Sequence, residues 1–213
     1  MPKYSSDDPF IDAASGVLKN RLGLTNEAAL EAAEADFAAE RSRELSRKPL
    51  AGRFDLEHLQ AIHRYLFQDV YAWAGELRTV DISKGGHPFA HHAHIQSAAA
   101  PLFKQLADEK HLAGLDTAAF SERAAHYLGE VNALHPFREG NGRAQREFIS
   151  ELARANGYSI AWRNVNPQDM LQASIASFKG DTSPLAAIIR ENISPLSVPE
   201  KEPPEPPHSG PKR

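Results

Sequence analysis

The stretch from His135 to Arg146, which reads His-Pro-Phe-Arg-Glu-Gly-Asn-Gly-Arg-Ala-Gln-Arg, restricts the fold of this chain more than any other segment. Because Pro136 disfavours helical backbone at the residue before it, a helix that reaches Leu134 is expected to end at His135. Asn141 is a suitable N-cap for a second helix that begins soon after it. The sequence therefore predicts a helix–loop–helix unit in which the His135 imidazole faces the loop.

The glycines and arginines of this loop favour an anionic ligand. Gly140 and Gly142 allow the backbone to curl so that its N–H groups point inward, at the start of the second helix. Arg143 and Arg146 are three residues apart and are expected on one face of its first turn. Cations at that end oppose the helix dipole by about 0.3–1 kcal/mol each, a cost that a bound phosphate would offset. If the arginines only paired with glutamates of the same helix, the glycines and the histidine would be unexplained.

Two further residues of the loop suggest a reaction. His135 is a suitable general base, because the ordinary pKa of histidine is close to neutral and a hydroxyl nucleophile needs such a base. Glu139 places a carboxylate beside the expected phosphate site, where a Mg²⁺ ion bound to phosphate needs one. The loop therefore has the groups needed to hold a nucleoside triphosphate and to activate a nucleophile against it.

The same stretch resembles the signature of the Fic family, His-x-Phe-x-(Asp/Glu)-Gly-Asn-Gly-Arg-x-x-Arg, and matches it at every fixed position. Enzymes of that family mostly transfer AMP from ATP to a hydroxyl side chain of a target protein and release pyrophosphate. The resemblance implies an all-α Fic fold, a bundle of about seven or eight helices with a short β-hairpin flap over the active-site loop. It also implies ATP as substrate and Mg²⁺ as the metal.

The resemblance assigns a role to each residue of the loop. His135 is expected to deprotonate the target hydroxyl, Glu139 to hold Mg²⁺, and Phe137 to anchor the loop in the core. The expected phosphate-binding residues are Gly140, Asn141, Gly142, Arg143 and Arg146. A related branch that phosphorylates its target has lysine at the position of Gly142, so the glycine favours AMP transfer.

Apolar residues at helical spacing, together with capping residues such as Asp55, predict further helices along the chain. The expected helices cover about residues 26–45, 55–67, 94–112, 116–134 and 144–156, one that begins at 166, and one at 184–192. We expect one Fic domain over residues 1–194. Residues 195–213 are rich in Pro, Glu and Lys, and are expected to form a disordered tail.

Residues 77–90 are the one segment expected not to be helical. Partial alternation at Val80 and Ile82, followed by two glycines, indicates a short β-hairpin. The segment resembles the Fic flap, against which a target segment pairs by β-augmentation. The candidate residues for target docking are Ile82, Ser83, Lys84 and Gly85. A solvated hairpin lysine explains Lys84 equally well.

Histidines outside the signature are expected to have no catalytic role. His87, His91, His92 and His94 lie close together in the sequence, but no cysteine or clear carboxylate completes a metal-binding set. We therefore expect that this cluster does not bind a metal. His63 and His126 fall within predicted helices and are expected to be packing or surface residues.

The sequence also bears on regulation. Many Fic enzymes carry an inhibitory motif, (Ser/Thr)-x-x-x-Glu-(Gly/Asn), but here no Ser or Thr is followed by Glu four residues later. The resemblance then implies a separate antitoxin that supplies an inhibitory helix, with a glutamate that pairs with Arg146. Tyr4 and the run from Val17 to Gly23 resemble the beginning of toxins that are inhibited in this way.

The resemblance leaves the target open. The toxin class points to bacterial type II topoisomerases, gyrase and topoisomerase IV, whereas a related class of type IV secretion effectors points to host proteins such as small GTPases. A kinase, a UMP- or phosphocholine-transferase, and a non-enzymatic nucleotide-binding module are further alternatives. The intact His135 argues against the last, because binding alone needs no base.

Composition excludes several other classes. The net charge of −4 gives no reason to expect binding to nucleic acid or membranes. The lack of cysteine excludes disulfides and thiol catalysis. We see neither an apolar leader nor an uncharged apolar run of about twenty residues. We therefore expect a protein of the bacterial cytoplasm, or one translocated from there into another cell.

Overall fold

The structure is a computed structural model that describes residues 8–84 and 86–196 of the 213-residue chain. Seven α-helices and two small antiparallel sheets make up its regular structure within those residues. The predicted all-α class and the predicted number of helices are therefore confirmed. None of the helices in this part of the chain is both long and apolar enough to cross a membrane.

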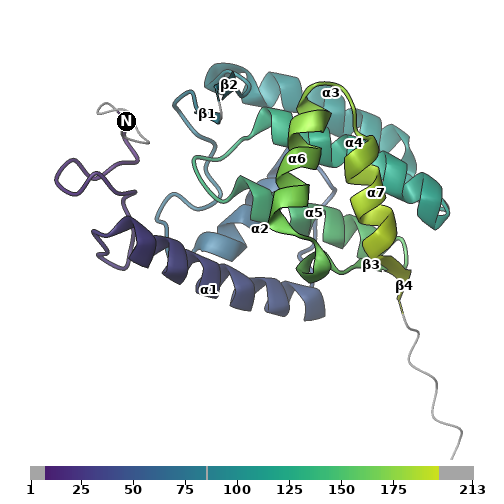
Figure 1. Cartoon of the computed structure of the whole chain (residues 1–213), viewed down its shortest axis with the longest axis horizontal. Coiled ribbons are helices and arrows are strands. Elements are labelled where there is room, and N and C mark those ends of the chain that lie inside the picture. The colour runs from purple at the N-terminus through teal and green to yellow at the C-terminus, as the bar shows by residue number, and fades with distance from the viewer. Residues whose placement is uncertain (1–7, 85, 197–213) are drawn as a thin grey trace, which may run out of the picture.

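The centre of the bundle is formed by α4 (Thr117–Leu134) and α5 (Asn141–Ala155), the two helices that the signature joins. On one side, α4 packs against α3 (Ile95–Asp108), α6 (Pro167–Phe178) and α7 (Ser183–Asn192). On the other side, α5 packs against α2 (Leu56–Phe67), and α1 (Glu27–Arg47) lies across both. This arrangement buries much of both central helices and most of the loop between them, in which only His135 and Glu139 are partly exposed (Figure 1).

Most predicted helix ends agree with the structure. Asp55, Asp116 and Asn166 each accept a hydrogen bond from a backbone N–H in the first turn of the helix that follows. The helix expected over residues 94–112 is shorter, because α3 ends at Asp108 and the backbone from Lys110 to Leu112 has positive φ angles of 53–63°. A 3-10 turn, Lys110–Leu112, replaces its last part.

The non-helical segments differ more from the expectation. The flap is a minimal hairpin of β1 (Ser83–Lys84) and β2 (His87–Pro88), so Val80 and Ile82 lie outside its strands. A second sheet, β3 (Tyr158–Ile160) with β4 (Ile193–Pro195), was not predicted. Pro195 belongs to β4, so the expected tail does not begin at this residue. Residues 197–213 of that tail, like Tyr4, lie outside the described residues.

Candidate active site

The signature loop begins as the sequence predicts. His135 is the C-cap of α4 in a left-handed conformation, with φ of 44°, and its N–H donates to the Val131 carbonyl at 3.0 Å. The next residue, Pro136, has no N–H with which to continue the helix. The chain therefore leaves α4 sharply, and the His135 side chain lines a cavity on the loop side.

The start of α5 differs from the prediction. Gly140, with φ of 77°, is the N-cap, and Asn141 is already the first helical residue. Predicting Asn141 as the N-cap was therefore wrong. Its buried side chain instead accepts from the Phe137 N–H at 2.9 Å and donates to the Phe137 carbonyl at 2.7 Å. These two bonds close the loop. In the first turn of α5 the Arg143 N–H donates to the Gly140 carbonyl at 3.1 Å, so the N–H groups of Asn141 and Gly142 are the ones left to a ligand.

His63 of α2 supports the loop from the interior. Its Nδ1 accepts from the Gly75 N–H at 2.8 Å, so Nε2 carries the proton that is donated to the Glu139 carbonyl at 2.9 Å. Its ring also stacks on buried Phe137, with 3.9 Å between the ring centres. Burial lowers the pKa of His63 to about 3, so the ring is neutral at pH 7. The sequence predicted only a packing or surface residue, because these partners are remote along the chain.

The His135 ring has one nitrogen that is free to accept a proton. Its Nδ1 lies 3.2 Å from the Asn132 carbonyl and must donate to it, so Nε2 has the free lone pair. Phe89 stacks on the imidazole with 3.7 Å between the ring centres and 13° between the planes. Burial, assisted by the charges of Lys84 and Arg78, lowers the pKa of His135 to about 4. The imidazole is therefore neutral at pH 7 and can accept a proton.

The cavity beside His135 has a volume of about 630 Å³ and two unlike sides. Its polar side is formed by the signature and the flap, and its apolar side by helices that come later in the chain. The polar residues on that side are Lys84, Asn132, His135, Glu139, Asn141, Gln145 and Arg146, and Ser174 and Lys179 add two polar groups to the opposite side. The apolar side includes Pro167, Met170, Leu171, Ile175 and Phe178. Of the predicted phosphate-binding residues, Gly142 also lines this cavity, whereas Gly140 does not.

The two signature arginines occupy different surroundings. Arg146 lines the main cavity, and no carboxylate in the described part of the chain pairs with it. Burial lowers the pKa of this guanidinium. Arg143 instead lines a second cavity of about 270 Å³ and forms an ion pair with Glu34 of α1. Glu139 lines both cavities and so marks where they approach each other.

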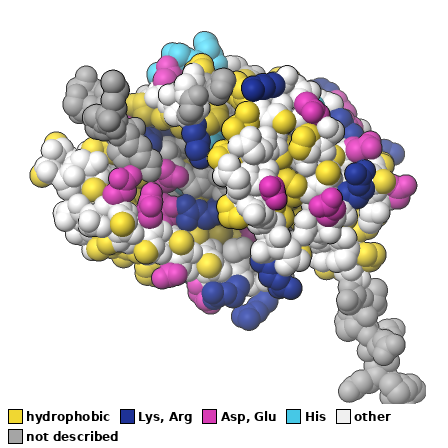
Figure 2. All heavy atoms as spheres, in the orientation of Figure 1, with side chains coloured by type: hydrophobic (Ala, Val, Ile, Leu, Met, Phe, Trp, Pro, Cys, Tyr) yellow, Lys and Arg dark blue, Asp and Glu magenta, His cyan; other side chains and the backbone are white. Residues whose placement is uncertain are grey.

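Glu34 is a site residue that the sequence analysis missed. It is only 4% exposed, accepts a hydrogen bond from the Tyr71 hydroxyl, and pairs with Arg143. Burial raises the pKa of its carboxyl in spite of the nearby arginine. No local pattern distinguishes it, because α1 is rich in Ala and Glu and its charges are typical of a solvated helix face. Figure 2 shows acidic side chains next to basic ones on the hollowed face between the start of α1 and α6.

Arg78 connects the flap to the signature. Its buried guanidinium donates to the carbonyls of His135 at 2.8 Å, Val80 at 2.7 Å and Leu134 at 3.3 Å, and also to that of Ala90. Its backbone N–H adds a bond to the Pro136 carbonyl at 2.9 Å. One side chain thus fixes both ends of the flap to the end of α4.

The candidate docking residues are only partly at the cavity. Lys84 of β1 lines it, whereas Ile82 and Ser83 do not, and Gly85 lies outside the described residues. The Ile82 carbonyl accepts from the Phe89 N–H at 3.2 Å, which holds the two sides of the flap together.

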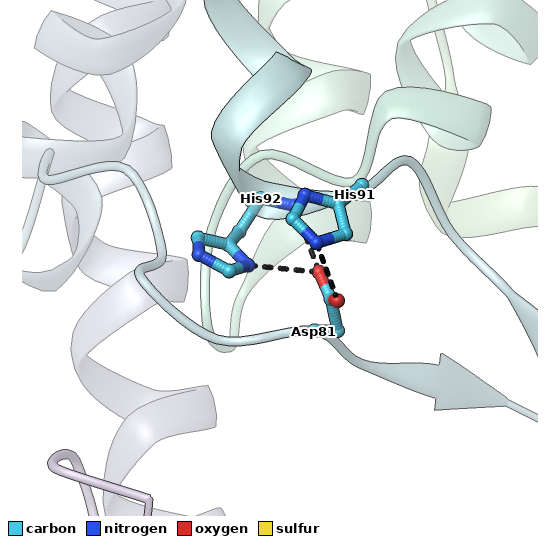
Figure 3. Close-up of side chains that lie close together, drawn as sticks. All are labelled: Asp81, His91 and His92. Carbon is cyan, nitrogen blue, oxygen red and sulfur yellow. Dashed lines mark hydrogen bonds and ion pairs between the residues drawn. The ribbon is translucent and has the colours of Figure 1, made fainter.

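The expectation that no carboxylate joins the histidine cluster was wrong. Asp81, just before β1, contacts both His91 and His92 (Figure 3). The hairpin brings these residues together, although they are separated along the chain.

Comparison with known proteins identifies the family. A profile of the Fic/DOC family matches residues 53–153. Over 187 residues, the chain is 39% identical to the Probable protein adenylyltransferase Fic of Escherichia coli K12, a match that covers 88% of this chain and 92% of that protein. The chain belongs to the Fic/DOC family.

Two other proteins are similar to this Fic domain. The Protein adenylyltransferase VbhT of Bartonella schoenbuchensis is 51% identical over 199 residues, which are 93% of this chain but only 42% of that protein. The crystal structure of the effector BepC from Bartonella tribocorum, with bound AMPPNP, superposes with a TM-score of 0.84 and 26% identity, over 88% of this chain and 97% of that one. The predicted enzyme class, a nucleotidyltransferase, is therefore confirmed at the level of the family.

Proposed function

We propose that this Fic domain transfers AMP from ATP to a hydroxyl side chain of a target protein. The observation that carries the proposal is the position of His135: its unprotonated Nε2 belongs to a partly buried, neutral ring that lines the same cavity as Glu139 and Arg146. Binding alone would need the arginine and the helix start, but it would not need a neutral histidine beside them.

The two sides of the main cavity suit the two ends of ATP. The start of α5 offers backbone N–H groups to phosphate oxygens, together with the guanidinium of Arg146, which pairs with no carboxylate among the described residues. The apolar side, with Met170 and Phe178, suits a nucleobase. The AMPPNP bound to BepC supports ATP as the substrate.

The carboxylate of Glu139 fits Mg²⁺, because this ion prefers oxygen ligands and keeps several waters while it bridges phosphates. Glu139 stands next to the start of α5, and its Oε1 is held at 3.0 Å from the Gly140 N–H. When bound there, Mg²⁺ would neutralise charge on the phosphate oxygens during transfer.

The proposed reaction follows from these positions. The target hydroxyl gives its proton to His135 Nε2 as its oxygen forms a bond to the α-phosphorus of ATP. The bond between the α-phosphorus and the bridging oxygen breaks, and pyrophosphate leaves. Arg146 and the first N–H groups of α5 stabilise the charge on the phosphates. Asn132 keeps the imidazole in the required tautomer through its carbonyl.

The flap is the proposed docking site of the target. Lys84 at the cavity and the backbone of β1 are placed to guide an extended segment of the target toward His135. The acceptor can be the hydroxyl of Ser, Thr or Tyr.

For the target protein, we favour the toxin hypothesis, in which the domain acts in the bacterial cytoplasm on gyrase or topoisomerase IV. Among the described residues, no carboxylate pairs with Arg146. This observation supports a separate antitoxin that supplies a glutamate to pair with Arg146. BepC supports the second candidate, modification of a host protein after translocation, because that relative is described as a VirB-translocated effector.

Label transfer in a bacterial lysate tests this function. ATP labelled at the α-phosphate is compared with ATP labelled at the γ-phosphate, with wild-type protein, His135→Ala and the matched control His94→Ala. We expect a protein band from the α-label alone, lost only in His135→Ala. A band from the γ-label alone would indicate a kinase and contradict the proposal. Repeating the assay with a host-cell lysate distinguishes the two target hypotheses, because an effector should label a host protein and a toxin should label a bacterial one.

A further inference from the structure

Both ends of the flap meet in a cluster of three side chains, Asp81, His91 and His92, which we call the flap-base cluster. In Figure 3 the two imidazole rings lie against the carboxylate of Asp81. His91 Nε2 is 3.2 Å from Asp81 Oδ2, and His92 Nδ1 is 3.0 Å from Asp81 Oδ1. One donor atom from each residue lies within 4.8 Å of the other two.

Two imidazole nitrogens and one carboxylate oxygen are a donor set that suits Zn²⁺, Co²⁺ and Ni²⁺, and that does not suit Mg²⁺. We propose that the flap-base cluster binds one such transition-metal ion, with water in the remaining coordination positions. The site is separate from Glu139, the ligand that we assign to Mg²⁺.

The carboxylate of the cluster is already held in place. The backbone N–H of His92 donates to Asp81 Oδ1 at 2.8 Å, and Nη1 of buried Arg78 lies 3.6 Å from the same oxygen. These contacts leave Oδ2 as the oxygen that faces the ion. Groups that orient a ligand in this way are typical of metal sites.

An ion would replace the contacts of both imidazoles with Asp81, since His91 Nε2 and His92 Nδ1 each face one of its carboxylate oxygens. His91 Nδ1 accepts from the Ala93 N–H at 3.2 Å, so the proton of a neutral ring is on Nε2 and points to Asp81. An ion at Nε2 shifts this proton to Nδ1, and water can then satisfy the Ala93 N–H. The side chains of Asp81 and His91 are 54% and 53% exposed, so ion and water can exchange freely.

An ion in this cluster would act on the flap. It would join the chain before β1 to the chain after β2, and so close the loop that carries Lys84 and Phe89. Closing a loop removes part of its conformational freedom. Because Phe89 stacks on His135 and Lys84 lines the main cavity, the bound ion would hold the flap over the active site. This effect rests on the proposed function, whereas metal binding itself does not.

Titration of the untagged full chain tests the site, without ATP and with excess Mg²⁺. Co²⁺ is followed by its visible absorption and Zn²⁺ by calorimetry. We expect one ion per chain, and a loss of affinity of at least about tenfold in Asp81→Asn, His91→Ala and His92→Ala. His94→Ala is the matched control, since its imidazole, 5.4 Å from that of His91 between ring centres, is outside the donor set. Far-UV circular dichroism checks that each variant is folded.

Two results would overturn the proposal: no saturable binding of either ion, or equal affinity in wild type and in Asp81→Asn. Hydrogen exchange provides a second measurement, in which Zn²⁺ should slow exchange of the flap amides in wild type and in His94→Ala but not in His91→Ala. Zn²⁺ binding by a protein that transfers no label to any target would support the metal site and count against the proposed function, so the two are tested independently.

Discussion

Glu34 of α1 pairs with Arg143 of α5, so a carboxylate of the same chain contacts an arginine that we propose binds phosphate. Glu34 is buried, and it is also held by the Tyr71 hydroxyl. Arg143 must therefore exchange or share this partner before it can contact a phosphate. The pair makes the second cavity part of the candidate active site, although no residue of α1 belongs to the signature.

Replacing Glu34 with Gln should increase the affinity for a non-hydrolysable ATP analogue by about tenfold, or roughly 1.4 kcal/mol. The amide keeps the shape and the hydrogen bond from Tyr71, but it no longer competes with phosphate for Arg143. Calorimetry in a His135→Ala background measures binding alone. The gain should vanish when Arg143→Gln is added, and a lower affinity in Glu34→Gln would mean that Glu34 orients Arg143 for the ligand.

The two signature glycines should respond differently to alanine. A Cβ at Gly140 would lie 2.4 Å from Phe67 Cζ, and the backbone of this residue has a φ of 77°. The unfolding free energy of Gly140→Ala should therefore be lower by at least about 2 kcal/mol, and the variant should not bind ATP. At Gly142, the nearest atom would be Arg146 Nη1 at 3.4 Å, and Gly142→Ala should stay within about 1 kcal/mol of wild type. Urea denaturation compares the pair, and equal losses in both variants would contradict this difference.

Phe89 should control the basicity of His135. Removing its ring in Phe89→Ala exposes the imidazole to water, so the pKa of His135 should rise from about 4 toward its ordinary value of 6.5. In the proposed reaction the unprotonated ring is the base, so the acidic limb of the pH profile of kcat/KM should move to higher pH. ATP affinity should not change. Phe37→Ala is the control, because that ring is exposed on α1 and lines neither cavity.

His63 should make the protein sensitive to mild acid. Its pKa is about 3 in the folded protein and has the ordinary value of 6.5 in the unfolded chain, so the unfolded chain binds the extra proton between these values, and stability falls as pH falls. From pH 7 to pH 5 this residue alone should remove about 2 kcal/mol of unfolding free energy. His63→Gln should flatten the pH dependence measured by urea denaturation, even if it lowers stability at pH 7. An unchanged pH dependence would show that another group is responsible.

Arg78 should be needed for the fold of the flap. Replacement by Met leaves the carbonyls of Val80, Leu134 and His135 without their donor, and each buried unsatisfied group costs about 1–3 kcal/mol. We expect a fall of at least about 3 kcal/mol in unfolding free energy. Lys84→Met, at an exposed cation on the same hairpin, should leave stability unchanged. Thermal unfolding of both variants makes the comparison.

Local sequence determined the helices and the composition of the signature loop. Caps such as Asp116 and the stop at His135-Pro136 act within a few residues, so their effect is readable without a structure. The same holds for the histidine, the glutamate and the arginines of the signature, because one loop carries all of them.

Tertiary structure decided which partners these residues have. Glu34 reaches Arg143 from more than a hundred residues away, His63 supports Glu139 from another helix, and Asp81 meets His91 across the flap. The N-cap of α5 is Gly140 and not the predicted Asn141, because the Asn141 amide forms its hydrogen bonds with the backbone of Phe137. Hydrogen bonds and ion pairs between distant segments depend on packing, and no local pattern in the sequence specifies that packing.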